Sequence, residues 1–196
     1  MSRMSRSDHA KPDAAGMKLT YDDLLLFPDD GNRHELIDGE HFVTPTPNIR
    51  HQTIVGAFHL LIASYLELHP LGRVFLSPLD VILSDYDVVE PDVLYVSHER
   101  DEALTGTHVR GVPELVIEIA SKGTRKRDET IKRWLYERVG VSEYWIVDLE
   151  IDVVRVYRRD SSGFARPTEL SREAGDVLST NLLPGLELPL VRIFRD

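Results

Sequence analysis

The sequence has no cysteine among its 196 residues, which excludes disulfide bonds, zinc–thiolate sites and cysteine nucleophiles. Long apolar runs are also absent: the longest, residues 54–66, is too short to cross a bilayer and contains His59 and Ser64. No apolar run precedes residue 24, so no signal peptide is expected. These absences favour a cytoplasmic protein that does not enter a membrane.

Basic residues are outnumbered by acidic ones. The formal net charge is −10, from 23 Lys and Arg against 33 Asp and Glu, which argues against a general nucleic-acid coat protein. The bases cluster in residues 121–133, SKGTRKRDETIKR, where Lys and Arg outnumber the two acids. A basic segment on an acidic protein can contact a phosphate backbone. Charge alone supports a solvated surface loop equally well.

The composition is that of a globular protein, with 42% hydrophobic and 29% charged residues. Residues 1–17 are polar and predict a disordered N-terminal tail. The rest, residues 18–196, has a length that suits a single domain.

Local signals predict the order of helices and strands. Thr20 can cap a short helix, Asp38-Gly39 predicts a β-hairpin, and a helix should begin after Asn48 and end at Pro70. A second helix is expected over about 125–139, capped by Thr124 and ended by Gly140. Strands are expected at residues 72–77, 80–84, 92–96 within the strand-like stretch 88–96, 113–120, 143–148 and 153–159. This order predicts an α/β fold in which a mixed sheet is flanked by helices, with an N-terminal hairpin.

Two carboxylates occupy unusual positions in these strands. Asp92 follows Pro91 inside the apolar stretch 88–96, and Glu118 shares a strand face with Val116 and Ala120. A buried carboxylate is costly unless it is paired, protonated or bound to a metal. If the two are cross-strand neighbours, they lie ~5 Å apart and could share one divalent cation. The alternative is that Asp92 pairs with an arginine and Glu118 faces solvent.

Three segments, EPDVLYV, PELVIEIAS and RKRDETIKRWLYERVGVSEYWIVD, resemble the Uma-type family of restriction-endonuclease-like proteins. HELIDGE and LPGLELPLVRIF resemble that family's start and end, so the resemblance covers roughly residues 20–194. The family belongs to the PD-(D/E)XK nuclease superfamily. The resemblance implies a restriction-endonuclease-like core and an endonuclease that hydrolyses DNA with Mg²⁺ or Mn²⁺.

The resemblance also implies roles for individual residues. Asp92 matches the metal-binding aspartate of the PD signature, and Glu118 matches the acidic residue of the following strand. The superfamily's lysine two residues later is replaced by Ala120, and in the Uma-type pattern Lys132 of the next helix stands in for it, with Lys122 as the alternative. Glu35 matches an acidic residue from the N-terminal part of the fold, with Glu40 as the alternative.

The chemistry is consistent with these residue types. Two carboxylates can hold Mg²⁺ or Mn²⁺, which lowers the pKa of the attacking water, and a lysine adds positive charge near it. The expected DNA contacts are Lys122, Arg125, Lys126 and Arg127. Two cuts on a DNA duplex would favour a homodimer. The alternative function is a catalytically silent nucleic-acid or protein interaction module, which the acidic balance and Ala120 favour.

Three further residues have plainer interpretations. His51 is expected on the surface at the start of its helix, with a supporting position beside the metal ligands as the alternative, and Trp134 and Trp145 are expected in the core.

Overall fold

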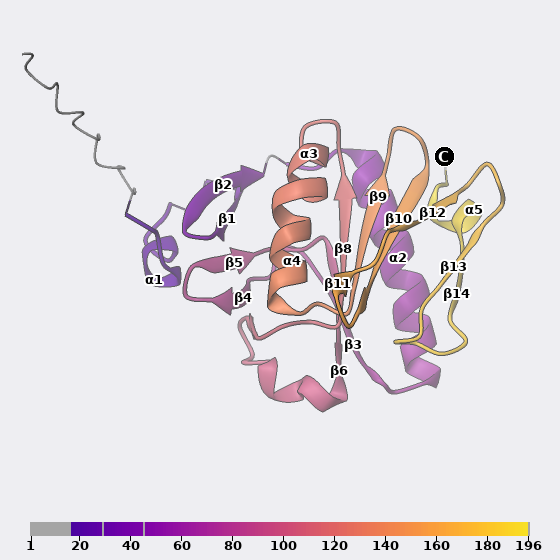
Figure 1. The fold of residues 1–196 in the computed structure, drawn as a ribbon, viewed down its shortest axis with the longest axis horizontal. Coiled ribbons are helices and arrows are strands. Elements are labelled where there is room, and N and C mark those ends of the chain that lie inside the picture. The colour runs from indigo at the N-terminus through magenta and orange to yellow at the C-terminus, as the bar shows by residue number, and fades with distance from the viewer. Residues whose placement is uncertain (1–16, 29, 45, 196) are drawn as a thin grey trace, which may run out of the picture.

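The structure, a computed structural model, describes residues 17–28, 30–44 and 46–195. The predicted disordered tail therefore lies outside the described residues except for Met17. The described strands form two large sheets and one two-stranded sheet, with helices packed on them (Figure 1), and the expected mixed α/β class is confirmed. No helix in the described ranges is long and apolar enough to span a membrane.

The smaller sheet carries the predicted hairpin. Its strand order is β2-β1-β5-β4-β7, and it consists of β1 (Arg33–Ile37), β2 (Glu40–Thr44), β4 (Val81–Ser84), β5 (Asp87–Val89) and β7 (Val109–Arg110). Asp38 and Gly39 form the hairpin turn with φ of 53° and 76°, the left-handed conformation that this pair favours. The short helix α1 (Tyr21–Leu24) precedes the hairpin, and Thr20 caps it as expected.

The larger sheet has the order β11-β10-β9-β8-β6-β3, with β12 also paired to β10. Only its β8–β9 pair is parallel among the described strand pairs of this sheet. The strands are β3 (Gly72–Leu76), β6 (Val93–Ser97), β8 (Leu115–Ala120), β9 (Glu143–Asp148), β10 (Val153–Asp160), β11 (Gly163–Phe164) and β12 (Thr168–Ser171).

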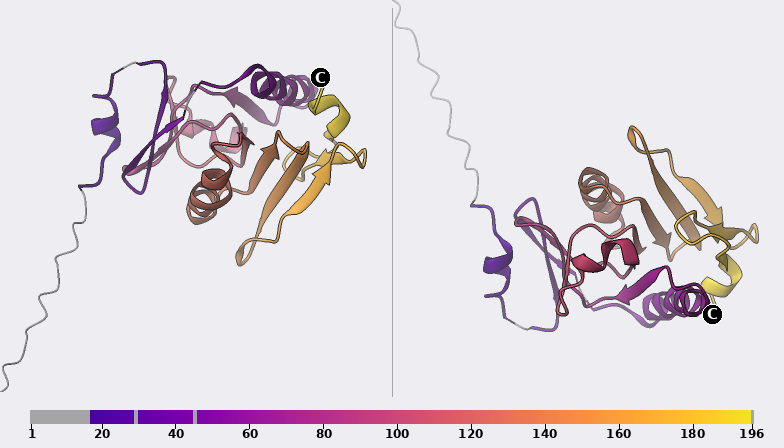
Figure 2. Two further views of the ribbon diagram at one scale, coloured as in Figure 1. Left: turned by 90° about the horizontal axis from the view of Figure 1, so that it is seen from above. Right: turned by 90° about the horizontal axis from the view of Figure 1, so that it is seen from below.

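Helices cover both faces of this sheet, as Figure 2 shows. Helix α2 (Ile49–Leu68) packs Phe58 and Ile62 onto the face of β8 that carries Ile117. Helix α4 (Arg133–Val139) packs Leu135 onto the opposite face, beside Val116. Because side chains alternate between the two faces along β8, α2 and α4 pack on opposite faces of the sheet.

The C-terminal segment completes the first of these layers. It forms β13 (Val177–Ser179), β14 (Glu187–Pro189) and α5 (Leu190–Ile193). Leu188, Leu190 and Phe194 join the same apolar cluster as α2, so the segment packs back on the core as its apolar pattern suggests.

The expected strand at 92–96 is confirmed as β6, but the strand-like stretch 88–96 as a whole is divided between two strands. β5 ends at Val89 in the smaller sheet, and β6 begins at Val93 in the larger one. Pro91 has no N–H for a ladder, and the N–H of Glu90 donates to Glu35 Oε1 at 3.0 Å instead of to a strand. Asp92 consequently lies in the short segment that connects the two sheets. A 3₁₀ helix (His98–Ala103) follows β6.

The helix predicted at 125–139 is irregular at its start. It comprises α3 (Arg125–Arg127), a π-helical turn (Asp128–Lys132) and α4. Thr124 does not cap it, because its Oγ1 accepts from the N–H of Ser121 at 3.0 Å. The π turn directs both Asp128 and Lys132 inward, where they are 2% exposed. Gly140 ends the helix as predicted, with a φ of 96°.

Two glycines give opposite expectations for the same substitution. Gly140→Ala should destabilise the protein by about 1–2 kcal/mol, because alanine disfavours the left-handed conformation. Gly56→Ala should stabilise it by about 0.5–1 kcal/mol, because Gly56 is exposed inside α2 with open space around its Cβ position. Urea unfolding of both variants checks this pair of signs. If the two substitutions changed the free energy of unfolding in the same direction, the backbone conformation assigned to one of the two glycines would be contradicted.

Candidate active site

Asp92 and Glu118 meet at the end of one antiparallel ladder. β6 and β8 pair with Val93 opposite Ile117, so the next pair outward is Asp92 with Glu118. The N–H of Ile119 donates to Asp92 Oδ2 at 2.8 Å, which ties the carboxylate to β8. Opposed residues in such a ladder have Cβ atoms about 4.5–5.5 Å apart. The structure thus brings together the two carboxylates that the sequence pairs as metal ligands.

Asp92 is held by two further donors. Arg33 Nη1 donates to its Oδ1 at 2.7 Å, and His51 Nε2 lies 3.1 Å from its Oδ2. Burial alone would raise the pKa of Asp92, but the hydrogen bond from His51 and the nearby charge of Arg33 lower that pKa to about 2. Asp92 is therefore a fixed, ionised carboxylate.

His51 is buried, so its expected surface position is wrong. Asn48 accepts the N–H of His51 at 2.9 Å and starts α2, which turns the imidazole toward the sheet. With His51 Nε2 donating to Asp92, the residue supports the carboxylate from the first turn of the helix.

Glu118 is joined to Glu35 through a buried lysine. Lys132 Nζ donates to Glu118 Oε1 and to Glu35 Oε1, each at 2.8 Å. Tyr136 donates its hydroxyl to Glu118 Oε1, also at 2.8 Å. Burial raises the pKa of Glu118 despite the opposing charge of Lys132. Burial also acts to raise the pKa of Glu35, but the charge and hydrogen bond of Lys132, the charge of Arg127 and the N–H of Glu90 together lower it. The two carboxylates raise the pKa of Lys132 despite its burial, so the ammonium stays charged.

The alternatives for these residues lie elsewhere. Glu40 and Lys122 are exposed, whereas Glu35 and Lys132 are buried beside Glu118. Of each pair of candidates, the structure thus brings only Glu35 and Lys132 to the Asp92–Glu118 pair. The solvated Asp128–Lys132 ion pair, which helical spacing alone would favour, is ruled out because both residues are buried.

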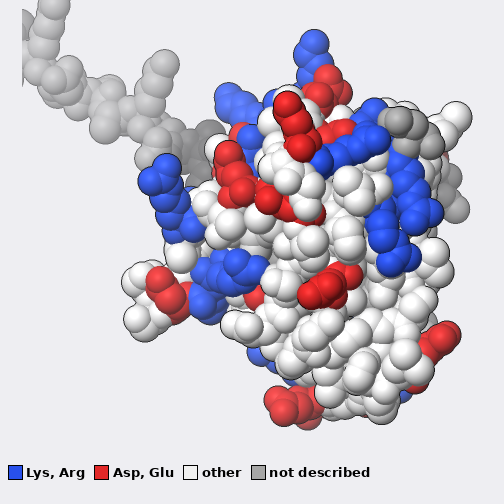
Figure 3. All heavy atoms as spheres, turned by 90° about the vertical axis from the view of Figure 1, so that its right-hand side faces the viewer, with Lys and Arg blue, Asp and Glu red and all other residues white. Residues whose placement is uncertain are grey.

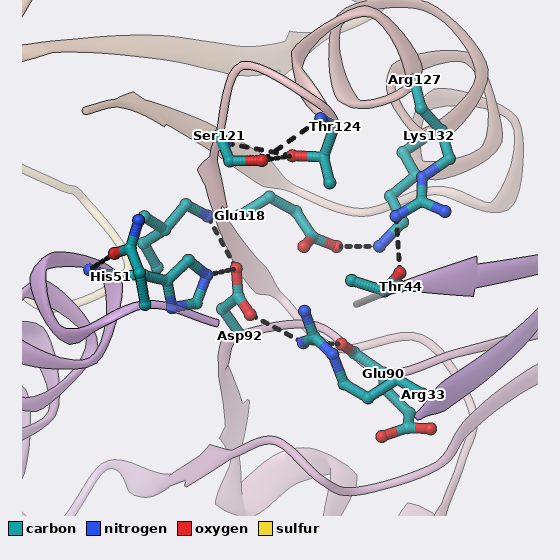
Figure 4. A network of polar contacts seen from close by, with 12 residues as sticks. Arg33, Thr44, His51, Glu90, Asp92, Glu118, Ser121, Thr124, Arg127 and Lys132 are labelled. Carbon is teal, nitrogen blue, oxygen red and sulfur yellow. Dashed lines mark hydrogen bonds and ion pairs between the residues drawn. The ribbon is translucent and has the colours of Figure 1, made fainter. Parts of the chain in front are cut away.

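A cavity of about 180 Å³ opens onto the carboxylate pair. Asp92, Glu118, Lys132, Arg33 and Arg127 all line it. Glu118 Oε2 accepts no hydrogen bond from the described residues, and Figure 4 shows this oxygen on the side of Glu118 that faces Asp92. One carboxylate oxygen thus stays available to a ligand in the cavity.

The donor set fits Mg²⁺ or Mn²⁺. A carboxylate offers about four lone-pair sites, of which Asp92 uses three and Glu118 two. Within the described ranges, no three His, Asp or Glu side chains come close enough to form a full set of protein ligands. Mg²⁺ needs no such set, since one or two carboxylates with water and substrate phosphate commonly hold it. The residues that would hold the ion are Asp92 and Glu118.

The basic segment divides into inward and outward side chains. Arg125 pairs with the buried Asp148 at 2.5 Å, and Arg127 Nη2 donates to Thr44 Oγ1 at 2.6 Å. Lys122 and Lys126 are exposed. Of the four expected DNA contacts, only these two lysines are free of such inward pairing.

The alternative that Asp92 pairs with an arginine is confirmed in part, since Arg33 is that partner, although Glu118 is buried rather than facing solvent. Sequence reasoning did not identify Arg33, missed Asp128 and misplaced Trp134. Arg33 shares a face of β1 with Glu35, and that two-residue spacing is a signal that could have found it. Asp128 is buried, which raises its pKa to about 6, and only the π turn explains its position. Trp134 is 49% exposed rather than in the core, and Arg138 lies over its ring at 4.5 Å, whereas Trp145 is buried as expected.

Comparison with known proteins adds two findings. A family model named Uma2 and described as "Putative restriction endonuclease" matches residues 20–191. A crystal structure from Anabaena variabilis ATCC 29413, described as a "putative nuclease belonging to DUF820", has a TM-score of 0.75 and 21% identity, and the match covers 90% of this chain and 97% of that one. At this identity the likeness establishes a shared fold. No curated protein is significantly similar to the chain.

The buried lysine gives a prediction about stability. Lys132→Met should cost about 3–5 kcal/mol, because it leaves Glu35 and Glu118 buried without their partner. Adding Glu35→Gln should recover part of the loss, since one stranded charge is removed. Urea unfolding measures both, with the exposed Lys126→Met as the control, expected within about 0.5 kcal/mol of wild type. Wild-type stability in Lys132→Met would contradict the buried triad.

Proposed function

The chain belongs to the Uma2 family, described as "Putative restriction endonuclease", and on this premise we propose that it is a metal-dependent endonuclease that hydrolyses phosphodiester bonds of DNA. The observation that carries the proposal is the pairing of Asp92 with Glu118 at one cavity, with the Lys132 ammonium held against Glu118. These are the charges that phosphodiester hydrolysis needs in one place.

Bound between Asp92 and Glu118, Mg²⁺ or Mn²⁺ would supply charge neutralisation for the scissile phosphate and a lower pKa for the attacking water. The chain's own residues prepare the site. Ile119 N–H and His51 fix the orientation of Asp92, so little reorganisation is needed on binding. Lys132 donates to two carboxylates and stays protonated, which assigns it an electrostatic role and argues against proton abstraction.

Two arginines make the cavity suitable for an anionic substrate. Arg33 and Arg127 line it, and the Nε of each is buried without a hydrogen-bond partner in the described part of the chain. Unsatisfied guanidinium donors beside a carboxylate pair match the oxygens of a phosphodiester. Duplex DNA cut on both strands would be served by a two-fold homodimer.

One observation favours the alternative, a catalytically silent interaction module. Asp92 already accepts from Arg33, His51 and Ile119, and Ala120 replaces the usual lysine of the strand. In that reading Arg33 permanently supplies the positive charge that a metal would bring. Metal-dependent cleavage separates the two functions.

Cleavage of supercoiled plasmid DNA tests the activity. Wild-type protein with Mn²⁺ should nick or linearise the plasmid, and chelation should stop it. Asp92→Asn should lower the rate on the order of 100-fold or more, because it removes one ligand charge at the reacting phosphate. Glu40→Gln, at an exposed acid of the hairpin, is the matched control and should retain the rate. Equal rates in Asp92→Asn and wild type would reject the proposed site.

The exposed lysines give a second prediction. Lys122→Gln with Lys126→Gln should weaken DNA binding and lower the slope of log K against log salt by ~0.9 for each phosphate that the variant no longer neutralises. The control is Arg192→Gln on α5. Figure 3 views the molecule from the side on which the C-terminal elements lie, and acidic and basic side chains are interspersed there. Fluorescence anisotropy across a salt series gives the slopes. Unchanged slopes in the double variant would leave this segment as ordinary solvated surface.

A further inference from the structure

A second pair of carboxylates lies at the end of another ladder. β4 and β5 pair with Val81 opposite Val89, so the next pair along is Asp80 with Glu90. Opposed residues in such a pair have Cβ atoms about 4.5–5.5 Å apart. Asp80 and Glu90 are thus neighbours in the same way as the two carboxylates of the candidate active site, but they belong to the smaller sheet.

The Glu90 carboxylate is buried without a close partner among the described residues. Glu90 is 9% exposed, and its Oε2 is buried without a hydrogen bond from any of them. Arg33 donates only to the main-chain oxygen of Glu90, at 3.3 Å. Figure 4 shows the Glu90 carboxylate directed away from Arg33 and Asp92, with no contact drawn to it. A buried carboxylate in this state requires a proton or a cation.

A cavity of about 190 Å³ is lined in part by Glu90. Asp80, Glu90 and Asn32 supply its acidic and amide groups, and its other walls include Leu24 and Phe27. Asp80 has one long hydrogen bond, from the Tyr21 hydroxyl at 3.5 Å, and burial raises its pKa. The nearby charge of His108, which does not line the cavity, opposes this rise in the pKa of Asp80, but no residue that lines the cavity forms an ion pair with Asp80 or Glu90.

The imidazole that lines the cavity cannot serve as that partner. His34 lines it, but its Nδ1 lies 3.0 Å from His41 Nε2 and its Nε2 lies 2.9 Å from Asp30 Oδ1. Both ring nitrogens are thus engaged outside the Asp80–Glu90 pair. A cation bound in the cavity would supply the charge that balances the two carboxylates.

We propose that Asp80 and Glu90 bind a divalent cation of the Ca²⁺, Mg²⁺ or Mn²⁺ class in this cavity. Such hard cations take carboxylate and amide oxygens and keep water as the remaining ligands, which suits two carboxylates beside Asn32. The cation neutralises Glu90 and ties the end of β4 to the segment Glu90–Asp92 that leads into β6. It does not require the chain to be a nuclease.

Calorimetry with Mn²⁺ on a variant that lacks the first site tests the proposal. Asp92→Asn should still bind one Mn²⁺, and adding Glu90→Gln should weaken that binding at least 10-fold. Asp80→Asn in the same background should do likewise. Asp85→Asn, at an exposed acid of the β4–β5 turn, is the matched control and should leave the affinity unchanged.

Thermal unfolding of the same proteins gives a second readout. Millimolar Mn²⁺ should raise the unfolding midpoint of Asp92→Asn and should not raise that of the variants that also lack Glu90 or Asp80. The proposal is overturned if Asp92→Asn binds no Mn²⁺, or if both double variants bind it as tightly as Asp92→Asn. Either failure would leave the nuclease proposal standing, because the candidate active site is already removed in every arm.

Discussion

The Lys132 ammonium, held between Glu35 and Glu118, is the interaction on which the rest of the site depends. It joins three elements that are distant in the sequence: the hairpin strand β1, the central strand β8 and the π turn before α4. Removing three charges from water is costly, and the cost is offset only when every charge has close partners. Here each hydrogen bond of the triad is 2.8 Å long, and Tyr136 supplies a further donor to Glu118. The π turn contributes to the triad because it directs the Lys132 side chain toward the sheet.

The passage between the two sheets explains the Pro91–Asp92 pair. The chain leaves the smaller sheet after Val89 and enters the larger one at Val93, so Pro91 stands where no ladder hydrogen bond is needed. Asp92 then lies one step beyond the β6–β8 ladder, where its carboxylate accepts from Ile119 and His51. An aspartate that would disrupt a strand interior is tolerated at this position because the ladder has ended.

Much of the fold follows from local patterns in the sequence, and much of the site does not. The caps at Thr20 and Asn48, the Asp38–Gly39 turn and the alternation along β8 are local rules, and the structure follows them. The failures arise where a distant partner decides. The N–H of Glu90 donates to Glu35, and His51 turns inward toward Asp92. Thr124 is a local exception, since its hydroxyl accepts from the N–H of Ser121, three residues earlier. The pairing of Asp92 with Glu118 is predictable from the sequence because each carboxylate interrupts an apolar strand pattern, whereas Arg33 and Asp128 require the tertiary structure.

The proposed chemistry requires above all that Asp92 and Glu118 share a divalent cation at the cavity beside Lys132. Anomalous diffraction from crystals soaked with Mn²⁺ measures this directly. We expect an anomalous peak within bonding distance of an oxygen of each carboxylate, with Lys132 still in contact with Glu118. Fully soaked crystals with no peak between these two side chains, and with Arg33 still paired to Asp92, would contradict it.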